Sequence, residues 1–167
     1  RVIRSPNNTL EKNDVSDNVV NGIVVAFVSH GTRLVENTVN RNRTGIVVRF
    51  DSNGNTIVGN TVNENFHGLL VVGSQNNVIT DNTASDNGNN GIFLLRGSHE
   101  NTIRRNTANG NVRAGIKIWD SNDNIVEANT ANGNGVSDAD VGSLGNGIGI
   151  ALSFDSSRNE ITGNWAC

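Results

Sequence analysis

Two carboxylates close together are the first residues in this sequence that could do chemistry. Asp138 and Asp140 lie two positions apart within residues 135–146, a segment rich in glycine and serine. Carboxylate oxygens are the ligands that Ca²⁺ prefers, and a pair of carboxylates can also serve as general acid and base. The alternative is a solvated loop in which both charges only aid solubility. Asp138 and Asp140 are therefore candidates for catalysis and for Ca²⁺, the one cofactor that the residues suggest.

Ligands for transition metals are sparse. The chain has no methionine, and its one cysteine, Cys167, is the last residue and has no partner for a disulfide within the chain. The three histidines, His30, His67 and His99, are widely spaced. Because copper and zinc sites need clusters of Cys, His or Met, we expect no such metal here.

A repeat of about 23 residues runs through the whole chain. Each repeat begins with a glycine that opens an apolar run, and the successive spacings are 23, 23, 23, 24 and 32. The last spacing is longer because residues 135–146 are inserted there. The glycines are Gly22, Gly45, Gly68, Gly91, Gly115 and Gly147.

Each repeat contains three short apolar segments separated by turns, with no helical period between them. The second segment ends on one series of asparagines and the third on another, and Asn suits both left-handed turns and stacked amide ladders. In one repeat, either Ile125 or Val126 is the inward residue of the second segment. The pattern predicts an all-β fold, a right-handed single-stranded parallel β-helix of about seven coils with three short strands each.

Alternation along the first strand of each coil separates core residues from outward ones. The residues expected inside are Ile23, Val25, Ile46, Val48, Leu69, Val71, Ile92, Leu94, Ile116, Ile118, Ile148 and Ile150. The residues expected outside are Val24, Ala26, Val47, Arg49, Leu70, Val72, Phe93, Leu95, Lys117, Trp119, Gly149 and Ala151. This outer face is unusually apolar, which indicates a partner surface, a ligand site or a covering loop.

The repeat Gly-Ile-x-Val-x-x-Ser-x-x-Asn-x-Ile-x-x-Asn-x-Ala-x-x-Asn resembles the parallel β-helix repeats of the pectin-lyase-like superfamily, especially its NosD-type and mannuronan-epimerase-like members. The resemblance covers essentially the entire chain. It implies the fold strongly and the function weakly, because the superfamily includes lyases, hydrolases, epimerases and proteins without known chemistry.

In polysaccharide-active members of the superfamily, this same strand face carries the cleft. The resemblance therefore implies that Trp119 and Phe93 stack on sugar rings, and that Lys117, Arg49 and Arg96 hold uronate carboxylates. Lys117 and Arg49 are also candidates for catalysis. The Asp-Pro-His-Asp motif of the epimerases and the Arg-x-Pro-x-x-Arg motif of the pectate lyases are absent. If the chain is an enzyme, the resemblance implies a polysaccharide lyase, an epimerase or a glycoside hydrolase.

Two functions from different classes follow. The first is an extracellular or periplasmic module that binds or helps to process an acidic polysaccharide, and the second is a structural β-helix that self-associates through its apolar face or open coil ends. A net charge of −3 with scattered basic residues disfavours nucleic acid, and no apolar stretch is long enough to span a membrane. We expect one domain over residues 1–167, cut from a longer β-helix, with 135–146 as a loop insertion.

Overall fold

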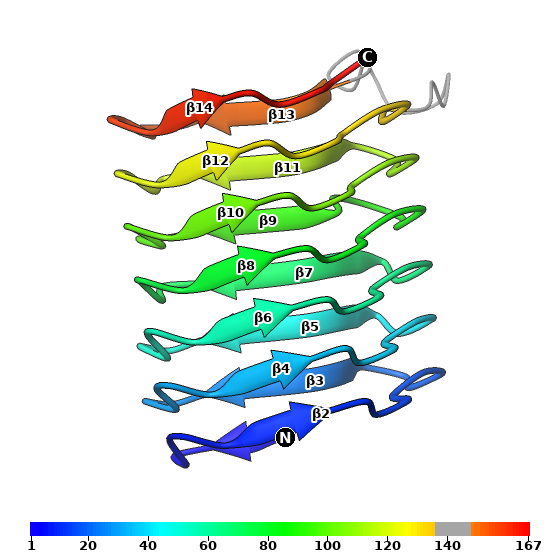
Figure 1. Cartoon of the computed structure of the whole chain (residues 1–167), viewed down its shortest axis with the longest axis vertical. Helices are drawn as coiled ribbons and strands as arrows, with labels where there is room; N and C mark the ends of the chain where they lie inside the picture. Colours follow the sequence, from blue (N-terminus) through cyan, green and yellow to red (C-terminus); the bar gives the residue numbers. More distant parts are fainter. Residues whose placement is uncertain (136–147) are drawn as a thin grey trace.

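The protein is a rod of stacked coils. The computed structural model describes residues 1–135 and 148–167, and the chain climbs through them as a right-handed coil with the two termini at opposite ends (Figure 1). Two parallel seven-stranded sheets face each other, and the described residues contain no helix, so none of them forms a helix able to span a membrane. The predicted parallel β-helix is confirmed.

The first sheet, sheet A, holds most of the longer strands. It contains β1 (Val2–Ile3), β3 (Asn21–Ala26), β5 (Thr44–Arg49), β7 (His67–Val72), β9 (Ile92–Leu95), β11 (Ala114–Trp119) and β13 (Ile148–Ser153). Sheet B, in front in Figure 1, contains β2 (Thr9–Glu11), β4 (Arg33–Val35), β6 (Thr56–Val58), β8 (Val78–Thr80), β10 (Thr102–Arg104), β12 (Ile125–Glu127) and β14 (Glu160–Thr162).

The third strand of each coil shrinks to a single bridge. These bridges stack in one column that runs through Asp14, Thr38, Thr61, Thr83, Thr107, Thr130 and Trp165. The alanine or valine that follows each bridge from Val39 to Ala131 is fully buried. The predicted third series of apolar residues is therefore part of the core, although it forms no extended strand.

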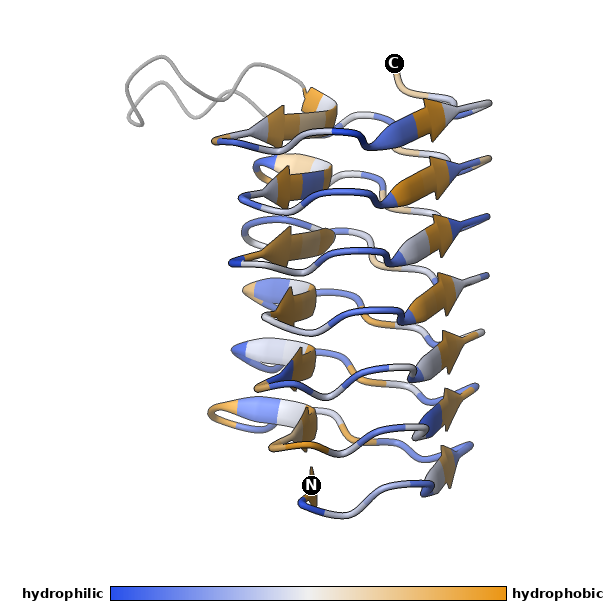
Figure 2. Cartoon of the chain, turned by 90° about the vertical axis from the view of Figure 1, so that its left-hand side faces the viewer, coloured by the Kyte–Doolittle hydropathy of each residue, from blue (hydrophilic) through white to orange (hydrophobic). Residues whose placement is uncertain are grey.

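The core lies between the two sheets. Ten of the residues expected inside sheet A, from Ile23 to Ile118, are at most 1% exposed, and Val126 rather than Ile125 is the inward residue of β12. Figure 2 shows the strands largely in orange and the connecting turns largely in blue or white. Stacked Ile, Val and Leu side chains thus stabilise the rod through burial of apolar area.

The last strand of sheet A corrects one prediction. Ile148 was expected inside, but it pairs with Ala114 and is 37% exposed, whereas Ile150 pairs with Ile116 and Leu152 takes the place opposite Ile118. Gly149, expected on the outer face, therefore aligns with Gly115. Gly147, which the spacing treats as the marker of this coil, lies outside the described residues. The error arose because the segment offers two glycines after an insertion.

The repeated glycine is required by close approach of the backbone. A Cβ atom built on Gly115 would lie 2.6 Å from the carbonyl oxygen of Ala108 and 2.7 Å from Nδ2 of Asn134. Both distances are far below van der Waals contact, so any side chain here would force the coil apart. The glycine therefore lets the chain enter sheet A tightly against the third side of the coil.

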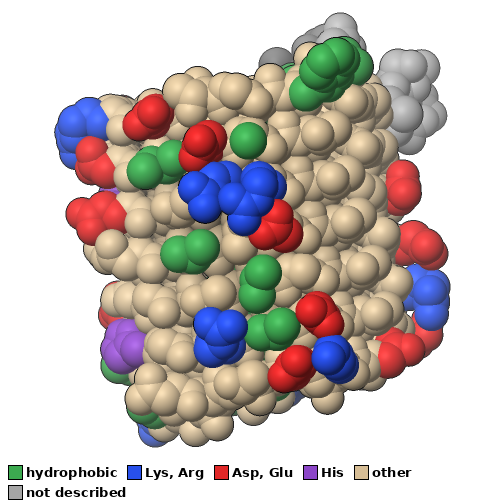
Figure 3. Space-filling model, viewed as in Figure 1, with side chains coloured by type: hydrophobic (Ala, Val, Ile, Leu, Met, Phe, Trp, Pro, Cys, Tyr) green, Lys and Arg blue, Asp and Glu red, His purple; other side chains and the backbone are tan. Residues whose placement is uncertain are grey.

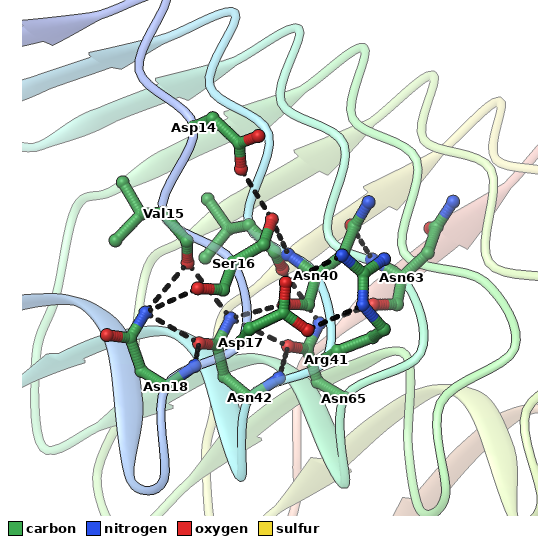
Figure 4. Close-up of polar contacts among 11 residues, drawn as sticks. Asp14, Val15, Ser16, Asp17, Asn18, Asn40, Arg41, Asn42, Asn63 and Asn65 are labelled. Carbon is green, nitrogen blue, oxygen red and sulfur yellow. Dashed lines mark hydrogen bonds and ion pairs between the residues drawn. The ribbon is translucent and has the colours of Figure 1, made fainter.

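Asparagine side chains form continuous ladders along the rod, as predicted. In the ladder through Asn82, Asn106 and Asn129, each Nδ2 donates to the Oδ1 of the next coil at 3.0 Å. The same Oδ1 also accepts a backbone N–H, as from Asn82 to Asn106 at 2.9 Å. Figure 4 shows part of a second ladder, through Asn18, Asn42 and Asn65. The ladders satisfy buried turn amides that no strand can reach.

Candidate functional site

The outer faces of the two sheets differ in charge pairing. On the sheet B side and its turns, basic and acidic side chains are interspersed (Figure 3) and form ion pairs such as Arg105 with Asp81 at 2.8 Å and Arg104 with Glu127 at 3.8 Å. Among the described residues, no ion pair involves a basic residue of sheet A or the basic residue that directly precedes β5 or β11. These unpaired cations are Arg43, Arg49, Arg113 and Lys117.

A continuous line of aromatic rings crosses the outer face of sheet A. The centroids of His67 and Phe93 lie 6.4 Å apart, those of Phe93 and Trp119 lie 6.3 Å apart, and those of Trp119 and Phe154 lie 4.8 Å apart. The last two pairs are stacked with interplanar angles of 27° and 24°. Phe66 adds an edge-on contact to His67 at 4.8 Å. The line spans β7, β9, β11 and the turn after β13.

Lys117 lies among these rings. Its Nζ atom is 5.6 Å from the ring centroid of Phe93 and 5.2 Å from that of Trp119, within the range of cation–π attraction. Burial and the nearby Arg113 guanidinium lower the pKa of Lys117. The ammonium group is therefore held by aromatic faces, with no carboxylate of the described residues in an ion pair with it.

His67 carries the same electrostatic signature. It opens β7, its backbone N–H donates to the carbonyl of Arg43 at 3.0 Å, and its side chain is half-buried. Burial is the main cause that lowers the pKa of His67, and the charges of Arg113 and Arg43 lower it further. Its Nδ1 atom is buried and has no hydrogen-bond partner. Cations and a histidine thus lie at the entry edge of sheet A, and none of the described carboxylates forms an ion pair with them.

A second cationic residue, Arg49, lies apart from this cluster. Its guanidinium carbon is 4.9 Å from the ring centroid of Phe50, and its Nε atom is buried without a hydrogen-bond partner. Three outward residues nearby, Val24, Ala26 and Val47, are at most 3% exposed and form a small apolar cluster of their own. The outer face of β3 and β5 is therefore a packed apolar surface.

Aromatic residues at the edge of sheet A occupy strained backbone positions. Phe27, Phe50 and Phe154 follow β3, β5 and β13 with φ of 57°, 58° and 49°, in the turn position that Gly73 occupies after β7. The left-handed conformation recurs at this turn position, as in Arg96 and Asp120, and costs a bulky residue of order 1–3 kcal/mol. Phe27 and Phe50 stack at 4.6 Å, while Phe154 stacks on Trp119.

The structure brings together three of the sequence-predicted site residues, Trp119, Phe93 and Lys117. Arg49 lies three strands from Lys117 in sheet A, about 14 Å at the usual strand spacing. Arg96 is exposed, in the turn after β9 with φ of 53°. Asp138 and Asp140 lie outside the described residues.

Four further residues belong to this site and were not predicted from the sequence: Phe154, His67, Arg43 and Arg113. Phe154 occupies the turn position of Phe27 and Phe50, so a column-by-column alignment of the turns could have found it. Arg43 and Arg113 directly precede β5 and β11, outside the strand residues to which alternation applies. Their closeness to His67, visible in three dimensions, distinguishes them from other surface arginines.

His30 and His99 have a structural role in the turns between the sheets. Nδ1 of His30 accepts the backbone N–H of Asn53 at 3.0 Å, and Nδ1 of His99 accepts that of Asn122 at 2.9 Å. In the same column, Asn53 Oδ1 accepts the N–H of Gln75 at 2.7 Å. The two histidines therefore replace asparagines of a ladder.

Together the coil, the amide ladders and the aromatic strand face define a pectin-lyase-like parallel β-helix protein. A family model described as periplasmic copper-binding protein (NosD) matches residues 1–165, and the chain belongs to this family. The comparison with curated proteins gave no significant match.

Solved structures of alginate epimerases share the fold. A periplasmic alginate epimerase AlgG is 19% identical, with a TM-score of 0.77 over 95% of this chain and 40% of its own. The D317A mutant of AlgG is 21% identical, with a TM-score of 0.78 over 97% of this chain and 46% of its own. The A-module of the Azotobacter vinelandii mannuronan C-5 epimerase AlgE4 is 15% identical, with a TM-score of 0.72 over 98% of this chain and 55% of its own. The chain thus spans about half the length of these structures.

Copper, the ion in the family's description, does not fit the described residues. They contain no group of three His, Cys, Asp or Glu side chains able to hold a metal ion. His30 and His99 are three coils apart, about 14 Å, and each uses Nδ1 as a turn acceptor. His67 is flanked by the charges of Arg43 and Arg113, which repel a cation. We derive no chemistry through copper from these residues.

Proposed function

We propose that the protein binds an acidic polysaccharide on the outer face of sheet A, along the line of Phe93, Trp119 and Phe154. One observation carries the proposal: the Lys117 ammonium lies between two aromatic rings and forms no ion pair with a described carboxylate. Flat aromatic faces suit the apolar faces of sugar rings, and an unpaired cation beside them suits a uronate carboxylate. The ligand class is a chain of uronic acids.

The relatives support this function and its location. The solved structures that share the fold are alginate epimerases, one of them described as periplasmic, and the family itself is described as periplasmic. We therefore place the protein in the periplasm or outside the cell. Arg49 and Arg96 extend the same face toward neighbouring coils and serve as further contacts for a long ligand. Processing of the polysaccharide, by this chain or by a partner, remains part of the proposal.

Binding of polygalacturonate and polymannuronate oligomers by isothermal titration calorimetry tests the proposal. We expect Trp119→Ala and Lys117→Ala each to raise Kd about tenfold, since a stacked ring or a desolvated cation contributes about 1 to 1.5 kcal/mol. Trp165→Ala and Lys12→Ala are matched controls, because they are the other tryptophan and lysine of the chain and lie away from this face. Both controls should bind as the unmodified protein does.

The experiment separates the two functions considered. A neutral glucan oligomer of equal length should bind weakly. Equal binding of neutral and acidic oligomers would contradict the role of Lys117, and no binding by folded protein would remove the proposal. Light scattering on the same samples then measures self-association, the alternative function of an apolar face.

A further inference from the structure

At the entry edge of sheet A, His67 lies between two arginines along the rod, and its backbone N–H donates to the carbonyl of one of them, Arg43, at 3.0 Å. Arg43 precedes β5, His67 opens β7 and Arg113 precedes β11. His67 connects to the line directly, because its ring lies 6.4 Å from that of Phe93. The cluster is therefore continuous with the Lys117 site but extends along the rod as far as β5, three strands from β11.

Arg113 links the two places. Burial is the largest cause of the lowered pKa of His67 and of Lys117, and in both cases the charge of Arg113 is the next cause. The other charge that acts on His67 is Arg43, which is also positive. Both charges that act on His67 are thus positive, and none of the ion pairs of the described residues includes Arg43 or Arg113. Like charges held together without a counter-ion favour the binding of an anion.

We propose that Arg43, His67 and Arg113 form a second anion-binding subsite, separate from Lys117, which the same ligand occupies with another of its carboxylates. This inference rests on the proposed function and assigns a second charged unit of the uronate chain to a place on the rod. His67 and Lys117 belong to strands two positions apart in sheet A, about 9 to 10 Å at the usual spacing. A monomeric uronate can occupy one subsite, whereas an oligomer occupies both.

The subsite makes binding depend on pH with a defined sign. In the free protein, burial and the two arginines depress the pKa of His67, so the imidazole is neutral at pH 7. A bound carboxylate screens the arginines and favours the imidazolium, so binding raises this pKa and takes up a proton. Affinity is therefore greatest below the pKa of the free protein and declines as pH rises through the pKa of the complex. Each unit by which binding raises the pKa of His67 corresponds to about a tenfold change in Kd across this pH range.

Calorimetric titration with a hexauronate between about pH 5 and about pH 8, where the uronate carboxylates stay ionised, provides the test. We expect the unmodified protein to bind more tightly at the acid end, and His67→Gln to abolish most of that dependence while still binding at pH 8. His99→Asn is the matched control and should keep the pH dependence, because His99 lies in a turn away from the face. Proton NMR should show the pKa of His67 rising on addition of the ligand.

The outcomes distinguish this inference from the proposed function. Binding with identical pH profiles in the unmodified protein and in His67→Gln would overturn the second subsite and leave the Lys117 site standing. Arg113→Gln provides an independent check. This substitution should raise the pKa of His67 in the free protein, and it should weaken binding of the hexauronate more than binding of the monomeric uronate. Equal weakening of both would contradict the assignment. Absence of binding at every pH would overturn the proposed function itself.

Discussion

Two histidines, His30 and His99, take the place of asparagine in a turn of the rod. Four turns in this column each direct one backbone N–H to the coil before it, and the acceptor is Oδ1 of Asn in two of them and Nδ1 of His in the other two. Any side chain that presents an acceptor at this distance satisfies the donor. The requirement is thus for an acceptor rather than for asparagine.

A substitution at His99 tests this equivalence. We expect His99→Asn to leave the free energy of unfolding nearly unchanged, and His99→Ala to lower it by about 1 kcal/mol, because the N–H of Asn122 loses its acceptor. Urea denaturation followed by circular dichroism measures both. A loss in His99→Asn equal to that in His99→Ala would show that the imidazole has another role.

Residue types alone identified part of the site. Trp119, Phe93 and Lys117 could be found because strand alternation placed them on one face, and the structure joins them. His67 and Phe154 could not be found in this way, since one lies at the start of a strand and the other in a turn with positive φ. Alternation predicts direction only within a strand, so site residues at strand ends escape it.

Strand register in this fold depends on the ladders as much as on the glycines. The spacing of glycines aligned Gly147 with Gly115 and thereby shifted β13 by two residues. The amide ladder gives the right alignment, because Asn124 pairs with Asn159 over 35 positions and Asn129 with Asn164 over the same interval. A shift of two leaves Ile150 and Ala151 on their predicted faces, opposite Ile116 and Lys117, and changes only the start of the strand.

The glycine that opens each long strand should tolerate no side chain. Gly115→Ala places a methyl group 2.6 Å from the carbonyl oxygen of Ala108, and we expect a loss of about 1 to 3 kcal/mol in the free energy of unfolding. Gly88→Ala is the control, since its nearest neighbour would lie at 3.4 Å and its φ is not positive. Thermal unfolding should separate the two variants by several degrees. Equal midpoints would contradict the steric account.

At the level of the whole molecule, the described strands contact strands of the successive coils. Every strand pair joins neighbours in one of the two sheets, so stability is a sum of coil and interface contributions. This arrangement follows directly from the repeat, which is why fold class and coil number could be predicted. The function could not be predicted in the same way, because one scaffold supports many activities.

The protection of backbone amides against hydrogen exchange should therefore vary along the rod. We expect amide hydrogen exchange to be slowest in β5, β7, β9 and β11, and fastest in β2 and β14, whose residues are largely exposed. Exchange measured by mass spectrometry on peptides from each coil reports the profile. Uniform protection from β2 to β14 would indicate a single all-or-none unit and contradict the additive account.

The amide ladders have a direction. Each rung donates from Nδ2 toward the coil that follows and accepts at Oδ1 from the coil before, as Asn37, Asn60 and Asn82 do in succession. After tandem duplication of a whole unit of about 23 residues, every Nδ2 donor would still face an Oδ1 acceptor. A coil inserted in the reverse direction would place donor against donor. Polarity of the side-chain amides thus makes tandem duplication the natural way for such a chain to lengthen.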